Sequence, residues 1–235
     1  MRIGVPTEVK NHEYRVALTP AGVHELIAHG HEVYVQRGAG LGSSIPDEDF
    51  LASGAAILET ADDVWATGDL VLKVKEPIAE EYAGCEPTRC CSPTCTSRRR
   101  GPAPTRCSTP APPPSPMMVS RMKPGSVLVD IAVDQGGCFE DTRATTHADP
   151  VFAMHNSLFY CVANLPGAVP HTSTYALTNV TLPYVVELAD QGWQAACAAD
   201  PALAAGLSTS DGALLSAPVA QAHGLPLAAP ALYAA

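Results

Sequence analysis

The chain has 235 residues, a formal net charge of −10 at pH 7 and a hydrophobic content of 46%. These values indicate a globular protein of one large or two modest domains. They argue against general nucleic-acid binding, which favours a basic surface, and no apolar run reaches the roughly 18 residues that a membrane-spanning helix needs. Residues 1–6 enter a strand-like segment without an apolar signal-peptide core, so we expect a cytoplasmic protein with no membrane partner.

Five of the eight cysteines lie between residues 85 and 107. A disulfide framework is typical of short secreted chains, and neither the length nor the start of this chain fits that class. We therefore expect the other three, Cys138, Cys161 and Cys197, to be half-buried free thiols.

Strands and helices alternate through the first 75 residues, which is typical of a parallel α/β sheet. Thr19 and Pro20 suit the N-cap and first position of a helix, and Gly30 suits its end. The other expected elements are strands at residues 2–5, 33–35, 55–58 and 69–75 and helices at residues 47–54 and 62–67. The last strand delivers a lysine at its end, in the sequence Lys73-Val74-Lys75-Glu76-Pro77.

A glycine cluster at residues 38–43 invites comparison with a dinucleotide-binding loop. Its spacing is G-x-G-x-G rather than G-x-G-x-x-G, and Ile45-Pro46 follows where the helix of such a loop should begin. We therefore interpret the cluster as a turn between a strand and the helix at residues 47–54.

Residues 85–117 interrupt the pattern with nine prolines, five arginines and five cysteines. From Gly84 to Met118 there is no Leu, Ile, Val, Phe or Trp, so this segment cannot bury a core and we expect it to be disordered. Its clustered cysteines lack the paired C-x2-C spacing of zinc sites, and we do not assign a zinc site to them. They are Cys85, Cys90, Cys91 and Cys95.

Regular structure is expected again after residue 118. Residues 127–134 are almost continuously apolar, which predicts a buried strand, and Gln135-Gly136-Gly137 closes its carboxyl end, where ligands bind in open α/β sheets. The remaining expected elements are a strand at residues 157–162 and helices at residues 119–122, 172–190 and 193–205, followed by a loop-like tail. Pro183 should kink the long helix, and Gly192 should end it.

Four stretches carry a resemblance that covers residues 1–83 and 118–235. They read MRIGVPTEVKNHEYRVALTPAGV, DLVLKVKEPIAEEY, VSRMKPGSVLVDIAVDQGGCFE and FYCVANLPGAVPHTSTYALTN, and the C-terminus continues the match. Together they resemble NAD-dependent alanine dehydrogenase, in the alanine dehydrogenase and pyridine nucleotide transhydrogenase family. The first two are shared with the transhydrogenase α subunit, whereas DIAVDQGGCFE and HTSTYALTN favour alanine dehydrogenase.

The resemblance implies an α/β fold whose parallel-sheet, Rossmann-like catalytic domain is built from both chain ends, with the NAD-binding domain inserted between them. Residues 1–84 would be the first catalytic segment, residues 166–235 the second, and residues 118–165 a remnant of the NAD-binding domain. No G-x-G-x-x-G follows a strand. A single βαβ unit takes about 30 residues and a dinucleotide-binding domain needs several. We therefore expect most of that domain to be missing, and NAD binding to be weak or absent.

The resemblance also implies roles for individual residues. Arg15 would hold the substrate carboxylate through its bidentate guanidinium, Lys75 would contact the substrate carboxyl or carbonyl group, and Asp134 matches the active-site aspartate near the nicotinamide. The segments on the nicotinamide side match Ile131, Ala132, Val133 and Asp134, and Val162, Ala163, Asn164 and Leu165. Without the resemblance, Arg15 and Lys75 would be interpreted as surface charges and Asp134 as a cap after a strand.

The implied reaction oxidises L-alanine with NAD and water to pyruvate, ammonia and NADH, in an oxidoreductase that forms homo-oligomers. The acid/base histidine of the family has no counterpart, because His147, His155 and His171 lie in downstream segments that do not match its motif. A divalent-metal pair found in some members would use Glu187 and a histidine one turn later. Gln191 occupies that place, so we expect no metal.

The interruption also suggests translation out of frame. If Thr94-Cys95-Thr96-Ser97 is encoded ACC TGC ACC TCG, reading from the third base gives CTG CAC CTC, or Leu-His-Leu. Continued through Arg106, the shifted frame can spell LHLAASRACTDAL, which resembles the family segment that bears the catalytic histidine. A second break would then lie near Pro116. A genuine proline-rich linker is the alternative.

Three functions remain open from the sequence. The first is a truncated alanine dehydrogenase of low or no activity, and the second is a non-catalytic subunit that pairs with intact alanine dehydrogenase chains. The third is an active dehydrogenase of unusual build. A buried-type strand at residues 127–133 without its usual neighbours also predicts exposed apolar edges and poor solubility.

Overall fold

The computed structural model describes residues 1–84, 90–93, 119–210 and 212–228. The chain divides into two compact units: the first contains residues 1–10, 14–98 and 171–235, and the second contains residues 11–13 and 99–170. Both chain ends therefore contribute to the first unit, as the expected α/β fold requires.

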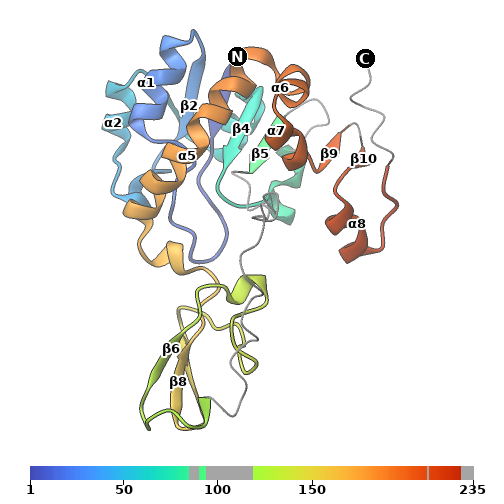
Figure 1. The fold of residues 1–235 in the computed structure, drawn as a ribbon. Coiled ribbons are helices and arrows are strands. Elements are labelled where there is room, and N and C mark those ends of the chain that lie inside the picture. Colours follow the sequence, from blue (N-terminus) through green and yellow to red (C-terminus); the bar gives the residue numbers. More distant parts are fainter. Residues whose placement is uncertain (85–89, 94–118, 211, 229–235) are drawn as a thin grey trace. The chain divides into compact units, whose positions relative to one another are not determined.

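A five-stranded sheet forms the centre of the first unit, with the order β3-β2-β1-β4-β5 and every neighbouring pair parallel (Figure 1). Its strands are β1 (Arg2–Val5), β2 (Glu32–Gln36), β3 (Ala56–Leu58), β4 (Leu70–Lys73) and β5 (Cys90–Pro93). Because β1 and β4 are parallel neighbours, with Gly4 opposite Val71, the loops that follow them leave the same edge of the sheet. The parallel sheet expected from the first 75 residues is confirmed.

Strand β5 lies inside the segment that we expected to be disordered. Its residues pair in parallel with β4, Leu70 opposite Cys90 and Lys73 opposite Pro93, so the expectation is wrong for these four residues. Backbone hydrogen bonds, which any residue except proline can donate, are enough to add an edge strand, and the one proline stands at its end. The rest of residues 85–117 lies outside the described part of the chain.

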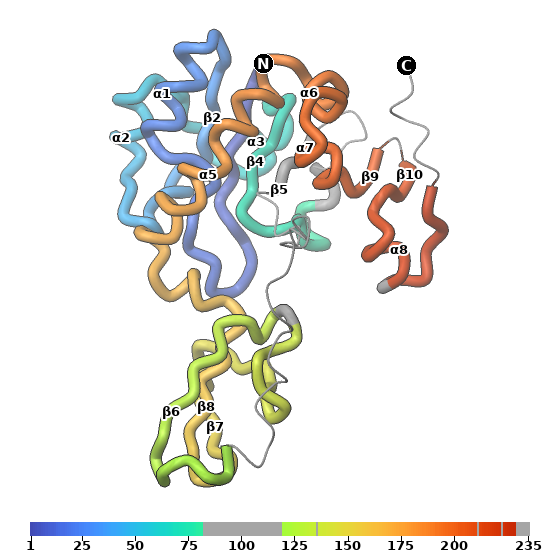
Figure 2. Tube along the Cα trace, in the orientation of Figure 1, coloured from blue at the N-terminus to red at the C-terminus, as the bar shows by residue number. Residues whose placement is uncertain are grey.

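Helices cover both faces of this sheet (Figure 2). Ile3 and Val5 belong to a buried cluster that also contains residues of α1 and α5, whereas Gly4, which alternates with them, lies against α3. A Cβ atom on Gly4 would lie 2.9 Å from Val64 Cγ1, so the absent side chain allows α3 to approach β1. The helices are α1 (Pro20–Ala28), α2 (Asp47–Ala52), α3 (Ala61–Thr67) and α5 (Pro170–Gln191).

Local chemistry sets the helix ends. The Thr19 side chain accepts a hydrogen bond from the Gly22 amide and caps α1, as the sequence predicted, and α5 continues through Pro183 to Gln191. The single helix expected at residues 193–205 is two, because Asp200 caps a new helix that begins at Pro201. These are α6 (Trp193–Ala199) and α7 (Pro201–Gly206), and they are followed by β9 (Thr209–Ser210), β10 (Ala213–Leu214) and α8 (Ala217–His223).

The second unit contains a three-stranded mixed sheet with the order β6-β8-β7. Its strands are β6 (Val127–Val129), β7 (Val151–Met154) and β8 (Ser157–Tyr160). β6 is parallel to β8, and β7 is antiparallel to it through a two-residue turn in which His155 and Asn156 both have positive φ angles. β8 confirms the strand expected at residues 157–162, whereas the sequence did not predict β7.

The long buried strand expected at residues 127–134 is wrong. β6 ends at Val129, and a 3-10 turn, η3, follows at Val133–Gln135. Val127, Val129 and Ile131 are 62%, 55% and 77% exposed, so only one face of β6 is covered. The cluster beneath that face is small and contains Val119, Leu128, Phe152, Phe159 and Cys161.

The three cysteines outside the interruption are free thiols, as expected, but none is half-buried. Cys138 is exposed, and Cys161 and Cys197 are buried. Among the described residues, no helix combines the length and apolar character needed to cross a bilayer.

Candidate active site

The lysine stretch predicted from the sequence begins at a buried ion pair at the end of β4. Lys73 is 2% exposed, and its Nζ lies 2.7 Å from Glu81 Oε1 and 3.4 Å from Glu8 Oε2. Glu81 belongs to the 3-10 turn η2 (Ala79–Gly84), and its second carboxylate oxygen accepts the Ile78 amide. A lysine inside an otherwise apolar strand is thus neutralised at the point where the strand becomes a loop.

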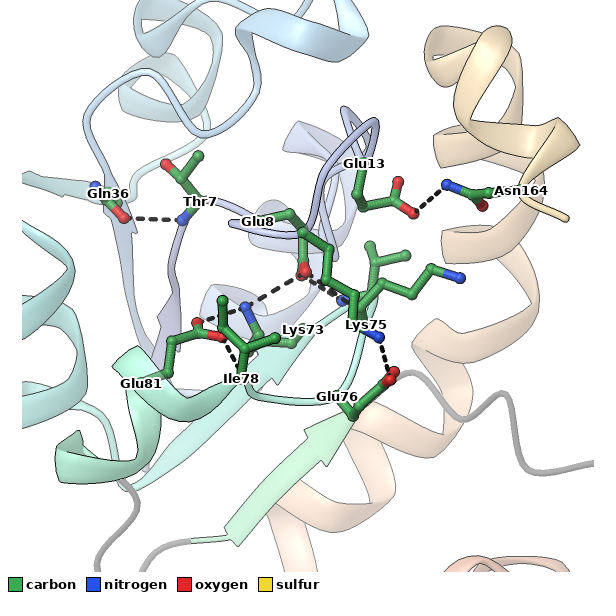
Figure 3. Close-up of polar contacts among 12 residues, drawn as sticks. Thr7, Glu8, Glu13, Gln36, Lys73, Lys75, Glu76, Ile78, Glu81 and Asn164 are labelled. Carbon is green, nitrogen blue, oxygen red and sulfur yellow. Dashed lines mark hydrogen bonds and ion pairs between the residues drawn. The ribbon is translucent and has the colours of Figure 1, made fainter. Parts of the chain in front are cut away.

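Glu8 binds the backbone of this loop (Figure 3). Its Oε1 accepts the Val74 amide at 2.6 Å and its Oε2 accepts the Lys75 amide at 3.3 Å. Burial raises the pKa of Glu8 above its ordinary value, although the Lys73 charge and the hydrogen bonds oppose the shift. Glu8 follows β1 and Lys75 follows β4, so the contact joins the loops of two neighbouring strands.

Lys75 itself is half-buried, and its ammonium group makes no hydrogen bond or ion pair with a described residue. Neighbouring charges are paired elsewhere, since Lys10 forms an ion pair with Glu76. The loop therefore presents an unpaired cation at the carboxyl edge of a parallel sheet, which is where such folds bind ligands.

Arg15 is 8% exposed and is therefore not the surface charge that the sequence alone suggested. The segment around it is held by a chain of hydroxyl groups: Thr174 Oγ1 accepts the Val16 amide at 3.2 Å and lies 2.7 Å from Ser43 Oγ, which donates to the Tyr14 carbonyl. Thr174 belongs to the HTSTYALTN stretch on α5, so a residue from the C-terminal part of the chain helps to fix the backbone on both sides of Arg15.

In the second unit, Asp130 organises the loop after β6. It is 1% exposed, and its carboxylate accepts hydrogen bonds from the Ala132 amide, the Cys138 amide and the Thr142 hydroxyl. Burial alone would raise the pKa of Asp130, but these hydrogen bonds together hold it below the ordinary value. The loop so fixed carries Ile131, Ala132 and Val133 into η3, where Asp134 is exposed.

The second predicted nicotinamide-side segment follows β8. Val162 is buried, Ala163 is exposed, and Asn164 and Leu165 are half-buried at the start of the 3-10 turn η4 (Leu165–Ala168). The Asn164 side chain donates to the His12 carbonyl and to Glu13 Oε2. The backbone carbonyl oxygen of Asn164 lies 2.8 Å from His147 Nε2. Because β6 and β8 are parallel neighbours, Asp134 and Asn164 lie on loops that leave the same edge of their sheet.

The predicted site residues thus fall into two groups, one in each unit. Arg15 and Lys75 belong to the first unit, and the segments of Asp134 and Asn164 belong to the second. His155 stands in the hairpin turn and His171 is exposed at the start of α5, so both are placed as expected for loop or surface histidines. His147 is half-buried and bound to the Asn164 carbonyl.

Sequence reasoning missed the residues that hold these groups in place. Two of them carried a signal, because Lys73 and Asp130 are charged residues inside apolar runs, and a buried charge requires partners. Glu8, Glu81 and Thr174 carried none, since their partners come from other parts of the chain.

Comparison with known proteins identifies the family. A sequence profile described as "Alanine dehydrogenase/PNT, N-terminal domain" matches residues 4–92, and the profile of the C-terminal domain of the same family matches residues 115–217. An alanine dehydrogenase of Mycobacterium tuberculosis is 39% identical over 367 alignment positions, which cover 98% of this chain and 99% of the relative. This chain belongs to the alanine dehydrogenase/PNT family.

Other known proteins are also similar to this chain in sequence or in fold. An alanine dehydrogenase of Mycolicibacterium smegmatis is 37% identical over 362 positions, covering 96% of this chain and 98% of the relative. A solved L-alanine dehydrogenase superposes with a TM-score of 0.81 at 25% identity, covering 95% of this chain and 99% of that one. A transhydrogenase from Sinorhizobium meliloti, at 17% identity and a TM-score of 0.71, covers 93% of this chain and 100% of its own, and shares the fold.

The glycine cluster after β2 does not have the form of a loop that binds the pyrophosphate of NAD, the cofactor that the alanine dehydrogenase resemblance implies. The glycine cluster after β2 forms the 3-10 turn η1 (Leu41–Ser43), and its glycines allow close packing. A Cβ atom on Gly40 would lie 2.5 Å from the Ile45 carbonyl oxygen, and one on Gly42 would lie 2.6 Å from the Tyr14 carbonyl oxygen. The interpretation of the cluster as a turn is confirmed.

No group of three or more His, Cys, Asp or Glu in the described ranges could hold a metal ion. The expected absence of a metal at Glu187 stays a prediction. The four cysteines to which we assigned no zinc site, and the shifted reading frame, fall in residues 85–117, whose side chains lie outside the described part of the chain.

Proposed function

We propose that this chain binds the carboxylate group of L-alanine or pyruvate at Arg15 and Lys75 and oxidises the amino acid slowly or not at all. The observation that carries the proposal is the half-buried Lys75 ammonium, which no described residue pairs, at the carboxyl edge of a parallel sheet. A small carboxylate is a suitable partner for it. Arg15, held between Tyr14 and Val16 by hydrogen-bonded segments, would add bidentate hydrogen bonds.

Low turnover is proposed from the length of the chain. It supplies 235 residues to alignments of 362 and 367 positions, so more than a third of each alignment has no counterpart here. The shortage supports the loss of most of the NAD-binding domain, with residues 118–165 as its remnant. Asp134, Ile131 to Val133 and Val162 to Leu165 would then be residues of a nicotinamide site without the loop that binds the pyrophosphate.

We also expect this chain to lack the catalytic histidine of the family, in addition to most of the NAD-binding domain. A positioned acid/base group contributes about 10²–10⁴-fold to a rate, so its absence alone would leave little activity. We attribute the loss to a shifted reading frame across residues 94–106. Sequencing the DNA across this region tests the attribution, because codons unable to read Leu-His-Leu-Ala-Ala-Ser in the shifted frame would rule it out.

The proposed function is tested by separating binding from turnover. The chain is mixed with L-alanine and NAD, with the Mycobacterium tuberculosis enzyme as positive control, and we expect no rise in NADH absorbance. Pyruvate binding is followed by NMR titration, and Lys75→Met should abolish it while Lys10→Met does not. Sustained NADH formation, or unchanged pyruvate binding by Lys75→Met, would contradict the proposal.

A second candidate function is a non-catalytic assembly subunit that pairs with intact alanine dehydrogenase chains. It is favoured by the apolar surface of β6, where Val127 and Val129 are more than half exposed. Co-purification of a tagged copy with the full-length relative would support pairing. A monodisperse monomer that does not bind the full-length alanine dehydrogenase would count against this function.

A further inference from the structure

The carboxylate of Glu8 is used differently from every other acidic group near the lysine loop. Glu8 is 9% exposed, and its two oxygens accept the amides of the two consecutive residues that follow β4, Val74 and Lys75. Glu81 pairs with Lys73 and holds Ile78, and Glu76 pairs with Lys10. Glu8 is thus a buried carboxylate bound directly to the backbone of Lys75, the residue proposed above to bind the substrate.

Glu8 is not the nearest counter-ion of Lys73. Lys73 already has a closer partner in Glu81, at 2.7 Å against 3.4 Å for Glu8. Burying a second carboxylate beside this ammonium costs desolvation free energy. Burial accordingly raises the pKa of Glu8. A carboxylate that is costly to bury and is the more distant of two counter-ions is explained by its other contacts, the two amides.

The sheet explains why this contact can set the position of Lys75. β1 and β4 pair directly, with Ile3 opposite Leu70 and Gly4 opposite Val71. Glu8 lies in the loop after β1, so the contact ties the first free residues after β4 to the neighbouring loop. Without this contact, the backbone of Val74 and Lys75 would be held in place through Lys73 and Ile78, which Glu81 binds at either end of the segment.

We propose that Glu8 is a positioning residue, which fixes the backbone of Val74 and Lys75 so that the Lys75 ammonium is presented to the carboxylate of a small 2-oxo or 2-amino acid. This inference rests on the proposed function for the identity of the ligand. The positioning itself is a property of the free chain and is measured without a ligand.

The experiment compares Glu8→Gln with Glu76→Gln in the full chain. Both variants remove one negative charge from the same region, but Glu76 pairs with a side chain. Glu8→Gln leaves Lys73 balanced by Glu81, so we expect it to fold, with unchanged amide exchange at Ile3 and Val33 in the sheet. Amide hydrogen exchange by NMR should accelerate about tenfold or more at Val74 and Lys75, as expected for weakening a hydrogen bond to a charged group.

Pyruvate titration provides the second readout. We expect Glu8→Gln to weaken pyruvate binding about tenfold, because the weakened hydrogen bonds hold the backbone of Val74 and Lys75 and do not contact the ligand. Glu76→Gln should leave the affinity within about twofold of the parent, since Glu76 pairs with the Lys10 side chain. Unchanged exchange at Val74 and Lys75, or unchanged pyruvate affinity in a parent chain that binds pyruvate, would overturn the inference. If the parent chain binds no pyruvate, the proposed function fails, and exchange at Val74 and Lys75 alone decides whether Glu8 positions the loop.

Discussion

The hydroxyl group of Thr174 lies 3.2 Å from the amide nitrogen of Val16 and accepts its hydrogen bond, although 158 residues separate the two along the chain. Thr174 is fully buried on α5, and Val16 precedes α1. The same hydroxyl contacts Ser43, which in turn donates to the Tyr14 carbonyl. The first unit, which both chain ends form, is therefore joined beside Arg15, where the substrate carboxylate is proposed to bind.

Thr174→Val should destabilise the first unit, because valine keeps the shape of threonine but leaves the Val16 amide and the Ser43 hydroxyl without this partner. Each buried polar group left unsatisfied costs about 1–3 kcal/mol. We expect a loss in that range, measured by urea denaturation. Thr172→Val is the matched control, since Thr172 is exposed at the start of the same helix, and it should change stability by less than about 0.5 kcal/mol. Equal losses in the two variants would contradict the assigned role.

Lys73→Met should be more severe. It removes the Lys73 ammonium from beside the buried carboxylates of Glu8 and Glu81, and breaking a buried ion pair in this way costs about 3–5 kcal/mol. Adding Glu8→Gln and Glu81→Gln to the same chain removes the two buried negative charges and should restore part of the loss. Denaturation of the single and triple variants checks the coupling, and a triple variant less stable than Lys73→Met would refute it.

Much of the first unit could be predicted from the sequence because its signals are local. The alternation of apolar runs gave the parallel strands, and Thr19 and Pro20 gave the start of α1. The roles expected of Arg15 and Lys75 came from the family resemblance, whereas the residues that hold them in place were not predicted. Glu8 and Thr174 act through partners 66 and 158 residues away, and such pairings leave no mark in the local pattern.

The second unit was harder to predict because its sheet is mixed and thinly covered. The turn at His155 and Asn156 places two positive φ angles side by side, a conformation that asparagine tolerates and histidine adopts less often, so the β7–β8 hairpin was missed. Residues 127–134 were expected to be buried because they form an apolar run. Such a run does not show whether other elements cover both faces of the strand or only one. In the structure, Leu128 is covered and Val127 and Val129 are not.

Asp130 should make the second unit sensitive to acid. Its folded-state pKa is held below the ordinary unfolded value of about 3.9, so the folded state binds a proton less readily than the unfolded state. The stability from its three hydrogen bonds is therefore fully present above that value and is lost as the pH falls through the lower folded pKa. Unfolding followed from pH 6 to pH 2 should show a steeper acid loss for the parent than for Asp130→Asn. Parallel curves would contradict this role for Asp130.

The exposed face of β6 should govern solubility. Val127 and Val129 are 62% and 55% exposed on a strand at the edge of its sheet, with no described strand on its outer side, and such edges promote association between chains. Val129→Lys places a charge on this edge without entering the cluster beneath it, so the soluble yield should rise and light scattering should fall. Leu128→Lys is the matched control, because Leu128 is 7% exposed in that cluster and its substitution should unfold the unit. If Val129→Lys scatters as much light as the parent, the β6 face is not what drives association, and pairing with intact alanine dehydrogenase chains through this face loses its support.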